Sequence, residues 1–355
     1  MRPMNVPGRR RRRARAMTML CVPAALAALA SAAAACDVCA VYTATEVGER
    51  RTGFRLGVAE QVTNFTTLQR DGREVPNPGN EWLTSSITQV VLGYTFGPRV
   101  GVQLNLPFIT RQFHRHEGDR LAHGDETGFG DLSLLAHVLA ASHVTERSVF
   151  RFSVLGGLKL PSGSTGRLKE ELSEGPATPA ALGTRTAFAQ HAAGGSGGGS
   201  ADVHAHVSGI HGHDLALGSG SVDGIFGGQL FWSWQRFFFT ATGQYALRTE
   251  GDIGYRYADE LSWTGGPGVF ALLEHDHTLG LQAVVSGESK GKDSLRGVPA
   301  DDTGVTALYA GPGVLFTWGS SLSADLTADL PVLQHNTALQ IVPDYRLRGG
   351  LTWRF

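Results

Sequence analysis

The sequence has little charge, few cysteines and, beyond its first residues, no long hydrophobic run. Charged residues make up 18% of the 355 residues and aromatic residues 8%, against roughly 25% charged residues in an ordinary soluble domain. Intrinsic disorder needs high charge and few aromatic residues, so this composition excludes it. After residue 35 no stretch approaches roughly 18 uninterrupted apolar residues, which excludes a later membrane-spanning helix. The sequence also shows no convincing catalytic triad, so we predict that the protein is not an enzyme.

Basic residues are scarce outside the amino terminus. Residues 1–35 carry seven arginines and no acidic residue, and the rest of the chain has 24 Lys and Arg against 32 Asp and Glu. Nucleic-acid binding requires a basic face. Nucleic acid is therefore excluded as a partner.

The amino terminus has the form of a secretory signal. An arginine-rich segment at 9–15 precedes an apolar stretch at 17–35, which ends in small residues with Ala33 and Ala35 at an A-x-A cleavage site. Read as a membrane helix, the stretch of about 19 residues is near the lower limit for spanning a bilayer. We predict that residues 1–35 are a cleaved signal peptide.

Two of the three cysteines lie just after this cleavage site. Cys21 leaves with the signal, whereas Cys36 and Cys39 form a C-x-x-C pair in a predicted periplasmic segment at 36–50. Ala40, and not a histidine, follows the pair, which excludes a haem attachment site. Four alternatives stay open: a disulfide, a redox or soft-metal site, an unused pair, and lipidation at Cys36.

Most of the remaining chain alternates apolar and polar residues. In SLSADLTADL, at 321–330, Leu and Ala alternate with Ser, Thr and Asp. Strict alternation of this kind predicts a β-strand with one apolar face. The same pattern recurs around 100–108, 132–138, 150–154, 226–234, 237–245 and 279–285.

The lengths of the strands and of their connections decide between two all-β folds. These segments run about 9 to 14 residues, whereas soluble strands cluster near 5 to 6 and strands that cross lipid need about 9 to 11. Short connections such as 235–236 alternate with longer ones, among them 112–127, 333–342 and a loop at 161–220. Outer-membrane barrels have short periplasmic turns and long outer loops. We predict a transmembrane antiparallel up-and-down β-barrel of about 12 strands at 51–355, with a secreted β-sandwich as the alternative.

The end of the chain supports the barrel. In YRLRGGLTWRF the residues Tyr345, Leu347, Leu351, Trp353 and Phe355 share one face. A terminal phenylalanine on an alternating aromatic strand resembles the signal that outer-membrane assembly machinery reads. We therefore expect that machinery, and outer-membrane lipid, as partners.

Two details conflict with a regular barrel. Glu60 falls on the apolar face of its strand, where a carboxylate at mid-bilayer is unfavourable. A bulge that turns Glu60 away, or a misread strand, would remove the conflict. The run Gly265 to Gly268 contains Pro267, which cannot donate to a strand ladder, so we expect a bulge or bend there.

Three motifs, in this order, resemble an outer-membrane family associated with meta-pathway phenol degradation. They are GFGDLSLLA at 128–136, GLKLPSGS at 157–164 and LGSGSVDGIFGG at 217–228. The resemblance covers about residues 85–355 and implies a small barrel that acts as a passive channel or uptake protein, without fixing a substrate. The glycines also have a structural reading, because glycine relieves strain at a barrel rim. The chain differs from the family in its C-x-x-C pair and in its loop at 161–220.

The lumen of a barrel with about 12 strands is narrow, and its lining carries both signs of charge. The alternation places Asp325 and Asp329 on one strand opposite arginines of the last strand. These pairs would hold the barrel shut, or would orient a polar solute across a pore. The predicted lumen residues are Arg111, Asp131, His137, Asp223, Arg256, Glu260, Asp325, Asp329, Arg346, Arg348 and Arg354.

Histidines recur in pairs with one residue between them. Of the four H-x-H pairs, His204 with His206 and His211 with His213 lie in the long Gly/Ser-rich loop. In extended backbone such a pair offers two imidazoles to one ion, and imidazole suits zinc, copper or nickel. The alternative is a solvated, biased loop without function. We expect no obligate cofactor, and we keep a metal site at these four histidines as a hypothesis.

Taken together, these patterns predict an outer-membrane channel or transporter for a small molecule, which diffuses passively through a narrow polar lumen. The alternatives are a metal-binding or sensing barrel that uses the histidine loop and the cysteine pair, and a structural barrel without transport. The solute and the oligomeric state are not predicted.

Overall fold

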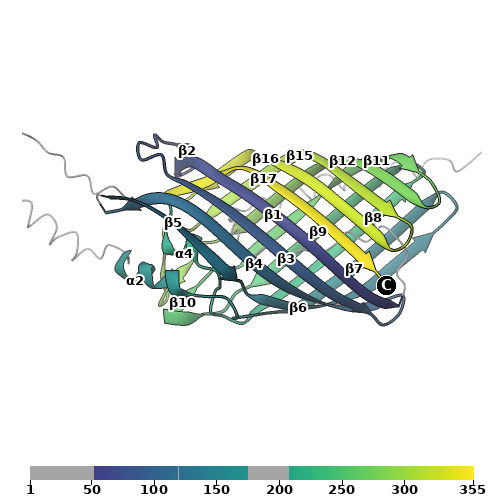
Figure 1. Cartoon of the computed structure of the whole chain (residues 1–355), viewed down its shortest axis with the longest axis horizontal. Helices are drawn as coiled ribbons and strands as arrows, with labels where there is room; N and C mark the ends of the chain where they lie inside the picture. Colours follow the sequence, from purple (N-terminus) through teal and green to yellow (C-terminus); the bar gives the residue numbers. More distant parts are fainter. Residues whose placement is uncertain (1–51, 119, 175–207) are drawn as a thin grey trace, which may run out of the picture. The chain divides into compact units, whose positions relative to one another are not determined.

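The computed structural model describes residues 52–118, 120–174 and 208–355, which form a closed antiparallel β-barrel (Figure 1). Its wall has twelve strands: β1 (Gly53–Arg70), β3 (Trp82–Thr95), β4 (Val100–Glu117), β6 (Leu132–Val144), β7 (Ser148–Leu160), β8 (Asp223–Trp234), β9 (Phe237–Leu247), β11 (Glu260–Leu273), β12 (His277–Lys290), β15 (Val305–Trp318), β16 (Leu322–Asn336) and β17 (Leu339–Arg354). Each strand pairs with the next, and β17 closes the barrel by pairing with β1 from Arg354↔Arg55 to Leu339↔Arg70. The predicted fold class and strand number are confirmed.

Shorter elements lie at one end of the barrel, away from the carboxyl terminus (Figure 1). They are β2 (Arg73–Glu74), β5 (Arg120–Phe129), β10 (Tyr255–Arg256), β13 (Ser294–Leu295) and β14 (Val298–Pro299), the 3-10 helices η3 (Gly166–Glu170) and η4 (Asp252–Gly254), and the helices α2 (Glu171–Glu174) and α4 (Gly212–Leu215). Within the described ranges no helix is long and apolar enough to cross a membrane.

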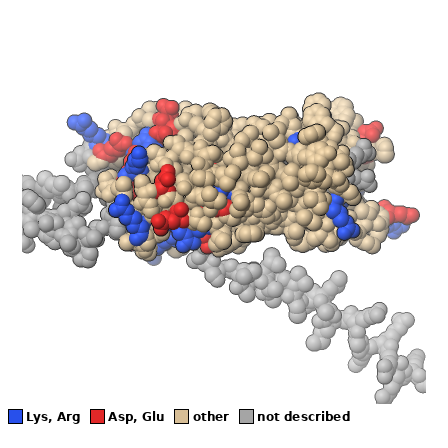
Figure 2. All heavy atoms as spheres, turned by 90° about the horizontal axis from the view of Figure 1, so that it is seen from below, with Lys and Arg blue, Asp and Glu red and all other residues tan. Residues whose placement is uncertain are grey.

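The alternation along each strand separates an apolar outside from a polar inside. On β16, Leu326 and Leu330 are exposed, whereas Ser323 and Asp329 are buried in the interior. On β8, Trp232 and Trp234 point outward. Figure 2 shows one side of the molecule, where Lys, Arg, Asp and Glu gather toward the two ends and a broad band between them consists almost entirely of other residues. An uncharged band on which large apolar side chains such as Leu326, Leu330 and Trp232 are exposed is suited to lipid.

Connections differ between the two ends of the barrel. At the end that holds the carboxyl terminus, five turns join the wall strands, at 96–99, 145–147, 235–236, 274–276 and 319–321. The other end, which we call the outer end, has the longer connections at 71–81, 118–131, 161–222, 248–259 and 291–304. The predicted loop at 333–342 is wrong, because β16 and β17 continue to a two-residue turn at 337–338. The predicted loop at 112–127 is mostly a β-hairpin. Its two strands are the end of β4 and β5, which pair from Phe108↔Phe129 to Glu117↔Arg120.

Glu60 lies on the outer face without a bulge. The register of β1 runs unbroken through Glu60, which pairs with Thr88 on one side and Gly349 on the other. Its carboxylate accepts hydrogen bonds from Ser86 Oγ (2.6 Å) and Thr88 Oγ1 (2.5 Å). Both expected explanations, a bulge and a misread strand, are therefore wrong. Two hydroxyls of the neighbouring strand satisfy the carboxylate instead.

The Gly-Pro-Gly run in β11 interrupts one ladder and keeps the register. Pairing with β12 stops between Gly265↔Val285 and Gly268↔Gln282, while pairing with β9 continues. At Gly266, which has a φ of 151°, a Cβ would lie 2.0 Å from the Ala283 carbonyl oxygen, so only glycine fits. The expected bulge is thus a local break in pairing.

Candidate functional site

A cavity of about 190 Å³ lies inside the barrel. Strands β1, β3, β9, β11, β12, β15, β16 and β17 border it, and most of its side chains carry amides, hydroxyls or charges. The polar side chains that line it are Gln61, Gln89, Thr240, Thr242, Gln244, Glu260, Ser262, Thr264, Gln282, Ser286, Glu288, Asp325, Thr327, Arg346 and Arg348. A space lined in this way can hold a small polar molecule.

Ion pairs fix the charges on one side of the cavity. Arg346 forms a bidentate pair with Glu288, at 2.9 and 3.0 Å, and Tyr309 donates to the same carboxylate at 2.7 Å. Arg348 lies 2.7 Å from Asp329, which also accepts from Ser286. Bidentate guanidinium–carboxylate pairs hold both side chains in one geometry. The cavity is therefore edged by charges that already neutralise one another.

A second charge cluster lies between the cavity and the outer end. Asp223 is fully buried and accepts from Lys159 and Arg248, both at 2.9 Å. Lys159 also pairs with Asp131 at 2.8 Å, and Arg248 with Glu260 at 3.2 Å. The cluster joins β7, β8 and β11 to Asp131, just before β6, and to Arg248, just after β9, and it stabilises the wall in this region.

Three further predicted residues are placed by the structure. Buried His137 lies on the inner face of β6, where its imidazole meets Gly101 of β4. Arg354 donates to Ser323 at 3.3 Å, near the carboxyl terminus. Arg256 lies in β10, outside the wall strands. Its side chain is 46% exposed and pairs with Asp259, so its predicted lumen position is wrong.

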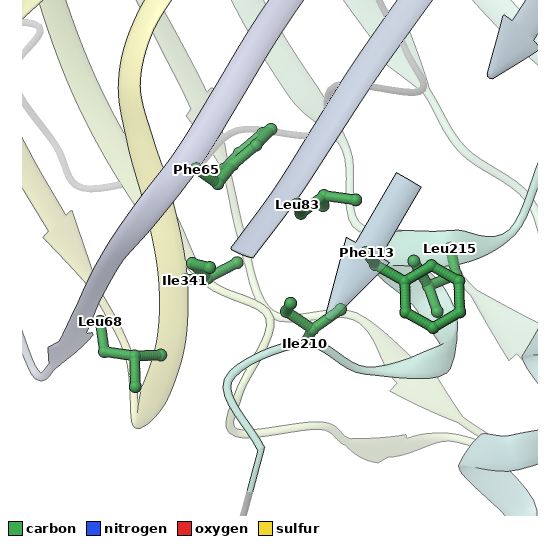
Figure 3. Close-up of a cluster of buried hydrophobic side chains, with 7 residues drawn as sticks. All are labelled: Phe65, Leu68, Leu83, Phe113, Ile210, Leu215 and Ile341. Carbon is green, nitrogen blue, oxygen red and sulfur yellow. The ribbon is translucent and has the colours of Figure 1, made fainter. Parts of the chain in front are cut away.

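Residues 208–222, which we call the plug, fill the outer end of the barrel. Ile210 and Leu215 of the plug are buried among inward-facing side chains of four wall strands. Figure 3 shows these seven residues: Phe65, Leu68, Leu83, Phe113, Ile210, Leu215 and Ile341. Further along the plug, Leu217 packs against Ile87 and Ile109. Apolar burial of this extent holds a loop in one position.

Polar contacts fasten the plug to the wall. Glu81, 2% exposed, accepts from the Gly209 backbone N–H at 2.9 Å, and also from the backbone (2.7 Å) and Nδ1 (2.9 Å) of His116. Burial by itself would raise the pKa of the Glu81 carboxyl, but these hydrogen bonds lower it below its ordinary value. Arg111 donates to the carbonyls of Asp214 and Ala216. Predicted as a lumen residue, Arg111 lies inside the barrel and binds the plug.

His211 and His213 lie in the plug, stacked with ring centroids 5.5 Å apart. His213 Nδ1 lies 2.9 Å from Glu171 of α2. Burial lowers the pKa of His213, but the negative charges of Asp214 and Glu171 outweigh it and raise that pKa to about 10. The other members of the predicted metal set, His204 and His206, lie outside the described residues, as do Cys36, Cys39 and the signal peptide.

The alternation of apolar and polar residues also indicates two inward-facing charged residues that are absent from the predicted lumen set. Lys159 follows the inward phase of β7, and Glu288 that of β12. Arg248 lies just beyond the end of β9, where alternation stops, so no pattern in the sequence placed it.

Comparison with solved structures places this fold among outer-membrane barrels. The chain is similar to the COG4313 outer membrane channel from Pseudomonas putida F1, with a TM-score of 0.57 and 14% identity over 88% of this chain and 100% of that one. It is more distantly similar to the β domain of the Bordetella autotransporter BrkA (TM-score 0.42, 9% identity, 86% and 100% covered). Neither a family model nor a curated protein matches the chain. At these identities the likeness shows the fold, and the link to phenol degradation stays a prediction.

Proposed function

We propose that the protein is an outer-membrane channel for small polar molecules, with its short turns in the periplasm and its outer end closed by the plug. One observation carries the proposal: a polar cavity of about 190 Å³ lies inside a closed barrel whose outer surface is apolar. A purely structural barrel gains nothing from such a space, because filling it with side chains would add packing.

The chemistry of the lining favours neutral or zwitterionic solutes. The charges at the cavity edge form pairs, such as Arg346 with Glu288 and Arg348 with Asp329, so the lining has no large excess of one sign. Amide and hydroxyl side chains such as Gln282 and Thr240 donate and accept hydrogen bonds, which replaces part of the water lost by a solute. A strongly charged solute would have to break one of the pairs.

Liposome swelling tests the proposal. Purified full-length protein in vesicles is compared with a variant whose plug is displaced by Ile210→Asp and Leu215→Asp. We expect swelling in small neutral sugars and zwitterionic amino acids to be at least tenfold faster with the displaced plug, and slower for anions and cations of equal size. Leu172→Asp places one aspartate on an exposed leucine of α2 and is the control for an added charge outside the packed plug. Swelling no faster than in protein-free vesicles, for every solute and both proteins, would leave the structural barrel as the better account.

A further inference from the structure

Three side chains of the plug converge on one point. His211, His213 and Asp214 each offer a ligand atom, and these atoms all lie within 4.8 Å of one another. His213 Nε2 is 3.4 Å from one carboxylate oxygen of Asp214, and His211 Nδ1 is 3.9 Å from the other. Two imidazole nitrogens and a carboxylate oxygen form a donor set used for zinc and neighbouring transition metals.

The far nitrogen of each imidazole lies next to a carboxylate. His213 Nδ1 is 2.9 Å from Glu171, and His211 Nε2 is 3.3 Å from Asp302. Protein metal sites commonly have this arrangement, because a carboxylate on the far nitrogen fixes the tautomer and strengthens the nitrogen that faces the metal. The nitrogens turned toward Asp214 are thus the two that would face an ion, and an ion bound there would displace the proton from His213 Nε2.

One of these two nitrogens, His211 Nδ1, is buried and unsatisfied within the described part of the chain. His211 is 6% exposed and caps the first turn of α4 opposite Asp214, whose carboxylate accepts from the His211 backbone N–H. Among the residues that the structure describes, the buried Nδ1 atom has no hydrogen-bond partner of good geometry. A buried polar atom left unsatisfied is unfavourable. A bound ion at this point would satisfy it.

The surroundings hold the imidazoles in place and leave space beside them. The His213 ring stacks on Tyr255, with centroids 6.4 Å apart and planes at 16°, and Tyr257 donates to the His213 carbonyl at 3.1 Å. Next to His213 and Asp214 lies a small cavity of about 60 Å³. Three protein ligands beside an open space are typical of sites in which water or another molecule completes the coordination.

Negative charge predominates around this point. The negative charges of Glu171, Asp214 and Asp293 all favour positive charge on His213. Asp302 lies 3.3 Å from His211 Nε2. Three cations border the cavity: Lys290 is paired with Asp293 at 2.7 Å, Arg346 is paired with Glu288 at 2.9 Å, and Arg111 of β4 binds the plug. The field of these carboxylates therefore favours a cation between the two imidazoles.

We propose that His211 Nδ1, His213 Nε2 and the Asp214 carboxylate bind one divalent transition metal ion, with zinc, nickel and copper as the suitable class. The ion would link the plug to α2 through Glu171 and to the 291–304 connection through Asp302. Since an ion bound to the packed plug stabilises that state, metal would keep the outer end closed.

Titration of the purified full-length protein with zinc chloride by calorimetry, and with cobalt chloride by visible absorption, tests the site. We expect one site per chain that His211→Gln removes and that Asp214→Asn weakens at least tenfold. Asn keeps an oxygen that can accept from the His211 backbone, so Asp214→Asn leaves the start of α4 capped. If both variants bound zinc with the stoichiometry and affinity of the wild type, the proposal would be overturned. The absence of zinc and cobalt binding to the folded wild type would also overturn it.

Two further variants separate a metal site from a structural histidine pair. Glu171→Gln removes the charge behind His213 and should weaken zinc about 10- to 100-fold. The control is His114→Gln with His123→Gln, which removes two imidazoles that lie 6.3 Å apart on β4 and β5. That control should bind zinc like the wild type. Loss of the zinc site in the control, with binding intact in Glu171→Gln, would contradict the assignment.

Discussion

At the scale of single residues, the inward charges are paired, and part of this pairing was predictable. Alternation placed Asp329, Arg346 and Arg348 inside the barrel. In the register Asp329 is opposite Arg346, yet Arg348 binds Asp329 and Arg346 reaches Glu288 on β12. Alternation tells which face a side chain takes. It says nothing of strands that meet across the interior, so this partner of Arg346 could not be predicted.

Arg346 and Glu288 give a stability prediction. Each is buried, so Glu288→Gln leaves the guanidinium without its charge partner and should destabilise the barrel by about 3–5 kcal/mol. Removing both charges with Glu288→Gln and Arg346→Met should recover most of that loss. Urea unfolding in lipid vesicles, followed by tryptophan fluorescence, measures both. A double variant as unstable as the single one would show that the unpaired charge of Arg346 is not the cause of the loss.

Glu81 gives a pH prediction. Its pKa is lowered from an ordinary value of 4.5 in the folded state, so its contribution to plug stability is present above about pH 4.5 and is lost as pH falls through the lower folded pKa. Limited proteolysis of the plug should therefore accelerate only below about pH 4.5. In Glu81→Gln the plug should be cleaved faster than in the wild type at neutral pH, and its cleavage rate should change little as the pH falls. A cleavage rate that rises as steeply below about pH 4.5 as in the wild type would contradict this role of Glu81.

At the scale of elements, the plug is the part of the barrel about which the sequence says least. The sequence predicts a long outer loop at 161–220, and the described parts of that connection contain η3, α2 and α4, with Leu168 and Leu215 fully buried. These helices are four or five residues long, so they show no helical period. Contacts with the wall, and not local propensity, determine their position.

The apolar contacts of the plug give a prediction at this scale. Leu215→Ala should cost about 2–5 kcal/mol of local packing and should increase hydrogen exchange in the plug while leaving the wall strands protected. The matched control is Leu172→Ala, because Leu172 is exposed on α2. Equal exchange in the two variants would mean that Leu215 does not hold the plug.

At the scale of the whole molecule, the barrel was largely predictable. Alternation over long strands indicated an apolar outside and a polar inside, and the difference between short and long connections indicated the two ends. Glu60 shows the limit of that reasoning, because two hydroxyls on a neighbouring strand satisfy it, and only the register brings them together. The extent to which the lumen is filled depends on how a long connection folds back, which no periodicity encodes.

The central claim is that this barrel is a small-molecule channel closed by its plug. Planar-bilayer recording of the purified protein tests it most directly, with the wild type compared with the Ile210→Asp, Leu215→Asp variant and the Leu172→Asp control. The account predicts rare, brief openings for the wild type and the control, and sustained conductance for the plug variant. Conductance of the folded plug variant that does not differ from bare lipid would contradict it.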